Sequence, residues 1–200
     1  MANAGERSDT VAAVILAGGR SRRFGRDKTR EVVGGTAVLE RVIAVARPLV
    51  DEVLVVGSWA PDGVRHVLEP DPGHGPLAGI AFGLTQVSTP HALVLAGDHP
   101  LLVPALLADL ISRRPGADAV VPMGPHGPEP LVGRYRASLA GVATDLVAAG
   151  QGSVKGFLAT IDTEWIDEIE WRTFDPAGHS FLDIDTVDDL AAVEAVIGGR

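Results

Sequence analysis

Residues Val11–Gly19 read VAAVILAGG, an unbroken run of apolar residues that ends in two glycines. Such a run is typical of a strand that is covered on both faces, as the strands of parallel sheets are. Glu52–Ser58 (EVLVVGS) and His91–Asp98 (HALVLAGD) have the same form, and Val64–Glu69 and Asp118–Met123 are shorter examples. The sequence therefore predicts a sheet of buried strands.

Helical patterns lie between these strands. They cover four ranges: Ala37–Arg47, Leu77–Val87, Pro104–Arg114 and Ala137–Ala149. Further along the chain we expect one more strand at Ile166–Phe174 and a closing helix at Val187–Ile197. Strands that alternate with helices predict an α/β fold of three layers, with a mainly parallel, Rossmann-like sheet between two layers of helices.

Length and composition favour one domain, which we place at residues 11–200 after a flexible leader at residues 1–10. The absence of cysteine excludes disulfides, a thiol nucleophile and zinc held by sulfur. The net charge of −9 argues against general nucleic-acid binding. No apolar run reaches the ~20 residues of a membrane span, and the N-terminus lacks a signal-peptide pattern. We therefore expect a cytoplasmic protein with no membrane or nucleic-acid partner.

Three loops follow predicted strands and are the first places to look for a ligand. They are the glycine-rich loop that runs from Gly18 to Lys28, the stretch Glu69–Gly79, and the turn at Asp98. In open α/β sheets ligands bind beyond the carboxyl ends of the strands. We expect the three loops to face one crevice.

The first loop, within LAGGRSRRFGRDK (Leu16–Lys28), combines glycines with cations. Glycines let the backbone approach a ligand closely and direct its N–H groups at phosphates. Lys28 stands out because the chain has only one other lysine, Lys155. The P-loop and dinucleotide-binding patterns are both absent. A solvated basic turn is the alternative, but the position directly after a buried strand favours phosphate binding.

Aspartates mark two further places. A carboxylate at the end of an apolar strand, as at Asp98, suits Mg²⁺, which takes few protein ligands and fills its shell with phosphate oxygens. A turn or N-cap aspartate is the alternative. Asp183 and Asp185 would point to the same side of an extended segment, where two like charges call for a cation or a shared proton. Thr186 also predicts a helix N-cap with an acidic first turn, and we expect both readings to hold in part.

The stretch GPLAGI (Gly75–Ile80) predicts a tight turn that opens a helix. The free N–H groups of such a helix start would suit an anion or a base edge. Glu69 and Asp71 lie just before it and could accept hydrogen bonds from a nucleobase or ribose. An ordinary helix start explains the spacing nearly as well.

Taken together, these motifs resemble those of the MobA-like nucleotidyltransferases. LAGGRSRRFGRDK looks like the family signature L-A-[GA]-G-x-x-x-R-[MF]-G-x-D-K, and GPLAGI, GDHPLL, EPLVGRY and FLDIDTVDDL resemble later blocks in the same order. The resemblance covers Val11 to Ile197 and implies a nucleotide-diphospho-sugar transferase-like fold. The pair Gly18 and Gly19 is more similar to guanylyl-transferring members than to cytidylyl-transferring ones.

The resemblance also implies substrates and partners. It implies GTP and molybdopterin, or its molybdenum-loaded form, as substrates, with Mg²⁺ as cofactor, and a guanine dinucleotide and pyrophosphate as products. Transient contact with cofactor-insertion proteins or acceptor molybdoenzymes would follow. Another small-molecule nucleotidyltransferase, or a non-catalytic nucleotide-binding protein on the same scaffold, remains an alternative because fold alone does not establish chemistry.

Carried over residue by residue, the resemblance implies a set of roles. Nucleotide contacts would come from Leu16, Ala17, Gly18, Gly19, Lys28, Asp71 and Asp98, with Glu69 as the alternative to Asp71. Lys28 and Arg22 would neutralise the triphosphate and the leaving pyrophosphate. Asp98 would hold Mg²⁺, and Asp185 would assist the metal or hold a metal-bound water.

The chain departs from the family pattern at three places. Gly57-Ser58 stands where relatives often have asparagine, and Glu129 stands where they often have histidine or glutamine. The stretch Asp183–Thr186 (DIDT) replaces the Asn-x-Asn-Thr that is frequent in guanylyl enzymes, and it also occurs in cytidylyl relatives. Molybdopterin cytidylyl transfer therefore stays open as an alternative.

Overall fold

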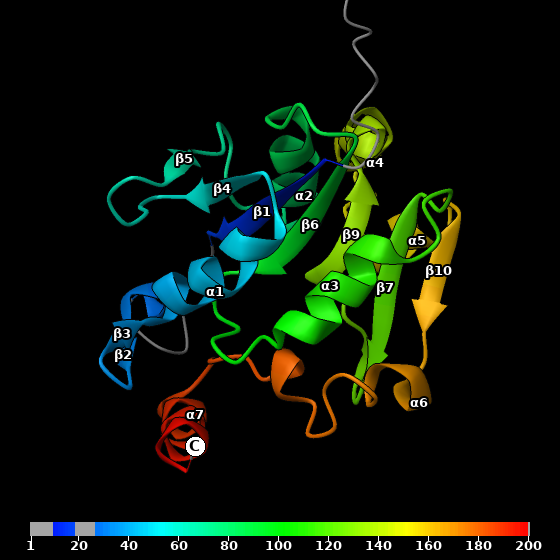
Figure 1. The fold of residues 1–200 in the computed structure, drawn as a ribbon. Helices are drawn as coiled ribbons and strands as arrows, with labels where there is room; N and C mark the ends of the chain where they lie inside the picture. Colours follow the sequence, from blue (N-terminus) through cyan, green and yellow to red (C-terminus); the bar gives the residue numbers. More distant parts are fainter. Residues whose placement is uncertain (1–9, 19–26, 200) are drawn as a thin grey trace, which may run out of the picture.

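The computed structural model describes residues 10–18 and 27–199. Its centre is a sheet with the strand order β10-β7-β9-β6-β1-β4-β5 (Figure 1). These strands are β1 (Val11–Ala17), β4 (Glu52–Gly57), β5 (Arg65–Val67), β6 (His91–Ala96), β7 (Ala119–Gly124), β9 (Val132–Arg136) and β10 (Thr163–Ile166). Three short strands complete the set: β8 (Gly127–Pro128) pairs with β7, and β2 (Val32–Val33) pairs with β3 (Thr36–Ala37).

The sheet is mainly parallel, as the sequence predicts. β1 lies between β4 and β6 and runs parallel to both, with Val14 opposite Leu54 on one side and Val94 on the other. β9 is antiparallel to both of its neighbours, β6 and β7. Its sequence, VGRYR, did not suggest a buried strand because arginines interrupt the apolar run.

Helices cover both faces of the sheet (Figure 1). One face carries α1 (Val38–Ala46), α3 (Pro104–Ser112) and α6 (Glu168–Trp171), and the other carries α2 (Pro76–Thr85), α4 (Ala140–Ala148) and α5 (Val154–Leu158). α7 (Val187–Gly198) lies beside β2. No helix within the described residues combines the length and the apolar character that crossing a bilayer requires.

The alternation of side chains along β1 separates two hydrophobic cores. Ala13 and Ile15 pack in the core beneath α1 and α3, whereas Ala12 and Val14 pack in the core beneath α2 and α4. All four side chains are fully buried. Because successive residues of a strand point to opposite faces, an all-apolar strand is what a sheet covered on both sides requires. The predicted three-layer α/β architecture is confirmed.

One predicted strand is wrong. Ile166–Phe174 was expected to be extended, but β10 ends at Ile166 and Glu168–Trp171 form α6. Asp167 is the reason, because its carboxylate accepts a hydrogen bond from the backbone N–H of Glu170 at 2.9 Å and caps a helix. The Glu170 carboxylate in turn accepts the N–H of Asp167, which completes a capping box.

A third, smaller cluster connects α7 to the rest of the fold. Val193 of α7 is buried with Ile184, Leu101, Val33 and Val38. The backbone N–H of Ile184 donates to the carbonyl of Asp98 at 3.2 Å. The segment before α7 therefore lies along the turn that follows β6, and residues far apart in the sequence meet at the carboxyl ends of the central strands.

Candidate active site

The central strands approach one another closely at their carboxyl ends because glycines lie there. A Cβ on Gly57, the last residue of β4, would lie 2.7 Å from the carbonyl oxygen of Ala17, and one on Gly97, directly after β6, would lie 3.1 Å from that of Leu16. The N–H of Gly97 donates to the Leu16 carbonyl at 2.9 Å. Asp98 therefore begins its turn directly beside the end of β1.

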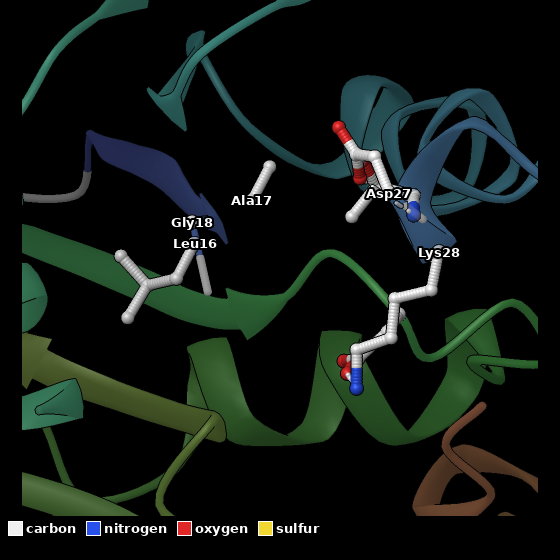
Figure 2. A pocket seen from close by; sticks show the side chains of 7 residues that line it. Leu16, Ala17, Gly18, Asp27 and Lys28 are labelled. Carbon is white, nitrogen blue, oxygen red and sulfur yellow. Dashed lines mark hydrogen bonds and ion pairs between the residues drawn. The ribbon is translucent and has the colours of Figure 1, made fainter. Parts of the chain in front are cut away.

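Lys28 opens a single 3-10 turn, η1 (Lys28–Arg30), that faces this end of β1. Asp27 caps the turn, since its Oδ1 accepts hydrogen bonds from the Thr29 N–H at 3.0 Å and from the Thr29 hydroxyl at 2.6 Å. Figure 2 shows Leu16, Ala17 and Gly18 on one side of a recess and Asp27 and Lys28 on the other. The recess is lined by Leu16, Ala17, Gly18, Asp27, Lys28, Thr29 and Asp98.

Lys28 joins two carboxylates that come from distant parts of the chain. Its Nζ lies 2.5 Å from Asp98 Oδ2 and 2.5 Å from Asp185 Oδ1. The side chains of Lys28 and Asp98 are only 19% and 17% exposed, so water screens this pair weakly. Burial by itself lowers the pKa of Lys28, but the two carboxylates outweigh burial and raise that pKa, which keeps the amine charged.

Asp183 completes a cluster of three carboxylates. One oxygen each from Asp98, Asp183 and Asp185 lies within 4.8 Å of the others. Asp183 and Asp185 share a side because Ile184 between them is buried in the third core cluster. Burial raises the pKa of Asp183, and the neighbouring carboxylates Asp185 and Asp98 raise it further. Such a set of hard oxygen donors fits a divalent cation such as Mg²⁺.

His99 and Glu129 border this cluster, and neither was among the predicted site residues. His99 is 8% exposed, and its Nδ1 donates to the Ser180 carbonyl at 3.0 Å, which leaves Nε2 3.9 Å from Asp98 Oδ1. Burial raises the pKa of the Glu129 carboxyl, which lies close enough to His99 and Asp183 for their charges to affect it. In the sequence, the departure of Glu129 from the family pattern was the feature that could have indicated a role for this residue.

The predicted helix start at Gly75 is confirmed, and a nucleotide contact at Asp71 or Glu69, just before it, stays a prediction. Gly75 has φ of 86° at the N-cap of α2, a conformation that favours glycine, and Pro76 occupies the first turn. Asp71 is exposed, and its carboxylate lies 2.8 Å from His74 Nε2. As far as the described residues show, Asp71 and Glu69 do not line the recess.

Several of the predicted site residues lie together in the structure. The structure brings together Leu16, Ala17, Gly18, Lys28 and Asp98, and it adds Asp185 through Lys28. Gly19 and Arg22, predicted to bind the nucleotide and to neutralise its phosphates, lie outside the described residues. Thr186 caps α7 as predicted, since its hydroxyl accepts the N–H of Asp189 at 3.2 Å.

The chain is similar to known nucleotidyltransferases both in sequence and in structure. Residues 13–168 match the family model described as the MobA-like NTP transferase domain, so the protein is a nucleotidyltransferase. The chain belongs to the MobA-like NTP transferase family. The solved structure of molybdopterin-guanine dinucleotide biosynthesis protein A from Archaeoglobus fulgidus is similar, with a TM-score of 0.82 and 25% identity over 94% of this chain and 100% of that one.

Curated relatives agree with this family. The chain is 39% identical to a probable molybdenum cofactor guanylyltransferase of Chloroflexus aggregans, over 94% of this chain and 95% of that protein. It is 31% identical to a molybdenum cofactor guanylyltransferase of Desulfosudis oleivorans, over 94% of this chain and 96% of that protein. The similarity therefore spans almost the full length of each relative.

Proposed function

We propose that the protein transfers GMP from GTP to the terminal phosphate of molybdopterin, or of its molybdenum-loaded form, and releases pyrophosphate. Lys28 lies between Asp98 and Asp185, beside Gly18 at the carboxyl end of β1, and this placement supports the proposal most directly. A fixed cation and a carboxylate cluster at that edge are what a triphosphate with a divalent metal needs. The relatives named molybdenum cofactor guanylyltransferase support the choice of a guanylyl donor and a molybdenum-cofactor acceptor.

The proposed reaction requires no catalytic base. An oxygen of the acceptor phosphate forms a bond to the α-phosphorus of GTP, and the bond from that phosphorus to the bridging oxygen breaks. The electron pair leaves with pyrophosphate. Because a phosphate monoester is already ionised near pH 7, no proton must be removed, and positioning and charge neutralisation carry the catalysis.

Different residues of the site would bind the nucleotide, neutralise its phosphates and hold the metal. The backbone of Leu16, Ala17 and Gly18 would hold the nucleotide, and the Lys28 ammonium would neutralise its phosphates. Asp98 would hold Mg²⁺ with help from Asp185 and Asp183, whose oxygens converge at the same place. When bound there, the metal would neutralise charge on phosphate oxygens.

Cytidylyl transfer is the second candidate, and one observation favours it. Asp183 and Asp185 stand where guanylyl enzymes frequently carry asparagines, so the cluster is more acidic than that pattern requires. The chemistry at phosphorus would be unchanged, and only the base of the nucleotide would differ.

Thermal unfolding with GTP, CTP, ATP or UTP, each with and without Mg²⁺, tests the choice of base. A ligand at a hundredfold excess over its Kd stabilises the folded state by about 2.7 kcal/mol. For a chain of this size each kcal/mol raises Tm by roughly 2–4 °C. We expect a shift with GTP that Mg²⁺ increases, followed by pyrophosphate release when molybdopterin is added. A Tm shift with CTP alone would show that CTP, and not GTP, is the nucleotide substrate. Pyrophosphate release that does not depend on molybdopterin would show that molybdopterin is not the acceptor.

A further inference from the structure

We propose that Trp59 is a positioning residue for Lys28. The inference rests on the proposed function, in which Lys28 must be held at the phosphates. Trp59 lies in the loop after β4, outside the lining of the recess. It acts through Thr29, the residue that follows Lys28 in the chain.

A chain of hydrogen bonds connects Trp59 to the turn that carries Lys28. The indole N–H of Trp59 donates to Thr29 Oγ1 at 3.0 Å. The Thr29 hydroxyl then donates to Asp27 Oδ1 at 2.6 Å, so the hydroxyl both accepts and donates. Thr29 is 5% exposed, which makes each of these bonds costly to lose. Both neighbours of Lys28 are thereby fixed.

Trp59 is itself anchored to the body of the domain. It packs, partly buried, against the core beneath α1 and α3. The guanidinium carbon of Arg30 also lies 4.6 Å from the centre of a Trp59 ring, a cation–π contact. The indole therefore holds η1 through Thr29 and through Arg30, one residue and two residues after Lys28.

This anchoring decides where the Lys28 amine lies. A single 3-10 turn has weak hydrogen-bond geometry and little stability of its own. The Lys28 side chain is long and must reach Asp98 and Asp185 from this turn. If the turn drifts, the amine is displaced from the phosphates, and a displacement of ~1 Å can lower a rate by up to about 10²-fold.

Two variants remove the bond from its two ends. Trp59→Phe keeps an aromatic ring and removes the N–H donor, and Thr29→Val keeps the shape and removes the hydroxyl. We expect each to lower kcat/KM for GTP by about tenfold, a part of the ~10² loss that misplacement can cause. The double variant should lose little more than either single variant, because both cut the same chain. Thr29→Ser should restore activity, and Trp165→Phe is the matched control.

A second readout observes Lys28 without any nucleotide. Because the chain has only two lysines, protein labelled with ¹³C-lysine gives one side-chain Cε resonance for Lys28 and one for Lys155. We expect the Lys28 resonance to move or broaden in Trp59→Phe and in Thr29→Val. The Lys155 resonance, from α5, should stay in place and report that the fold is intact.

The two readouts separate this inference from the proposed function. An unchanged Lys28 resonance and an unchanged kcat/KM in both variants would overturn the positioning role. Full additivity in the double variant would also overturn it. A Lys28 resonance that moves in both variants supports the role even if the wild-type protein releases no pyrophosphate from GTP, in which case the proposed function alone has failed.

Discussion

At the scale of single residues, the site depends on opposite charges held at low exposure. Lys28 and Asp98 are each less than one-fifth exposed, and Asp185 adds a second carboxylate to the same amine. The sequence indicated Lys28, Asp98 and Asp185 separately, from a rare lysine and from carboxylates near strand ends. It could not show that they touch, because their contact depends on how the segment before α7 returns to β6.

We predict that Asp98→Asn lowers turnover by more than ~100-fold, the loss expected when a central electrostatic group of an active site is removed. The amide keeps the shape but removes the charge that would hold Mg²⁺. Steady-state pyrophosphate release at saturating GTP and Mg²⁺ is the measurement. The exposed Asp62→Asn is the matched control and should retain turnover. Near-normal turnover of Asp98→Asn would remove this residue from the metal role.

The two lysines provide a second test at this scale. Lys28→Ala should weaken GTP binding and slow turnover together, because one ammonium serves both the bound triphosphate and the leaving pyrophosphate. Lys155→Ala removes the same charge from α5 and should change neither. Isothermal titration with GTP and Mg²⁺ and the pyrophosphate assay measure the two effects. Equal behaviour of the two variants would show that Lys28 does not serve the phosphates.

At the scale of elements, α2 lies on β1 through glycines. A Cβ on Gly79 would meet Leu16 Cδ1 at 3.4 Å, an ordinary contact, whereas one on Gly83 would overlap Val14 Cγ1. Val14 is buried in a central strand and its branched side chain has little freedom to move. The close approach of helix and strand therefore depends on Gly83 more than on Gly79.

These two glycines give a matched pair of substitutions. Gly83→Ala should lower the free energy of unfolding by about 1–3 kcal/mol, the usual cost of overpacking a core. Gly79→Ala should be neutral or stabilising by up to ~1 kcal/mol, because alanine is the better helix former. Urea unfolding followed by circular dichroism measures both. Equal losses at the two positions would contradict the packing described here.

The cap of α7 is a second element that supports the site. Thr186→Ala removes the hydroxyl that accepts the Asp189 N–H and should lower the free energy of unfolding by about 1 kcal/mol. Thr144→Ala, at an exposed position within α4, removes no cap and should cost less or stabilise slightly. Urea denaturation again measures the difference, and a Thr144→Ala loss as large as that of Thr186→Ala would argue against the cap.

Apolar patterning in the sequence predicts some of these strands and helices and misses others. Buried parallel strands such as β1 and β6 were predicted because both faces of each are apolar. β9 was missed because Arg134 and Arg136 stand in it, and Arg134 is nonetheless only 2% exposed. The prediction of a strand over Glu168–Trp171 is wrong because Asp167 and Glu170 form a capping box, which begins a helix there.

At the scale of the whole molecule, the two main cores lie on opposite faces of one sheet. β1 contributes side chains to both cores, so the packing of each core depends on it. We therefore predict that residues 11–200 unfold as one cooperative unit. Far-ultraviolet circular dichroism should report the same urea midpoint as the fluorescence of Trp59, Trp165 and Trp171. Two separated transitions would show that the chain contains more than one unit.

The bond between Lys28 and Asp185 joins residues 157 positions apart. A ribosome therefore adds Asp185 long after Lys28 and Asp98. During translation, Lys28 and Asp98 can meet before the second carboxylate exists. The complete charge cluster can form only after the segment that carries Asp185 has left the ribosome, so its assembly reports that translation has passed this point.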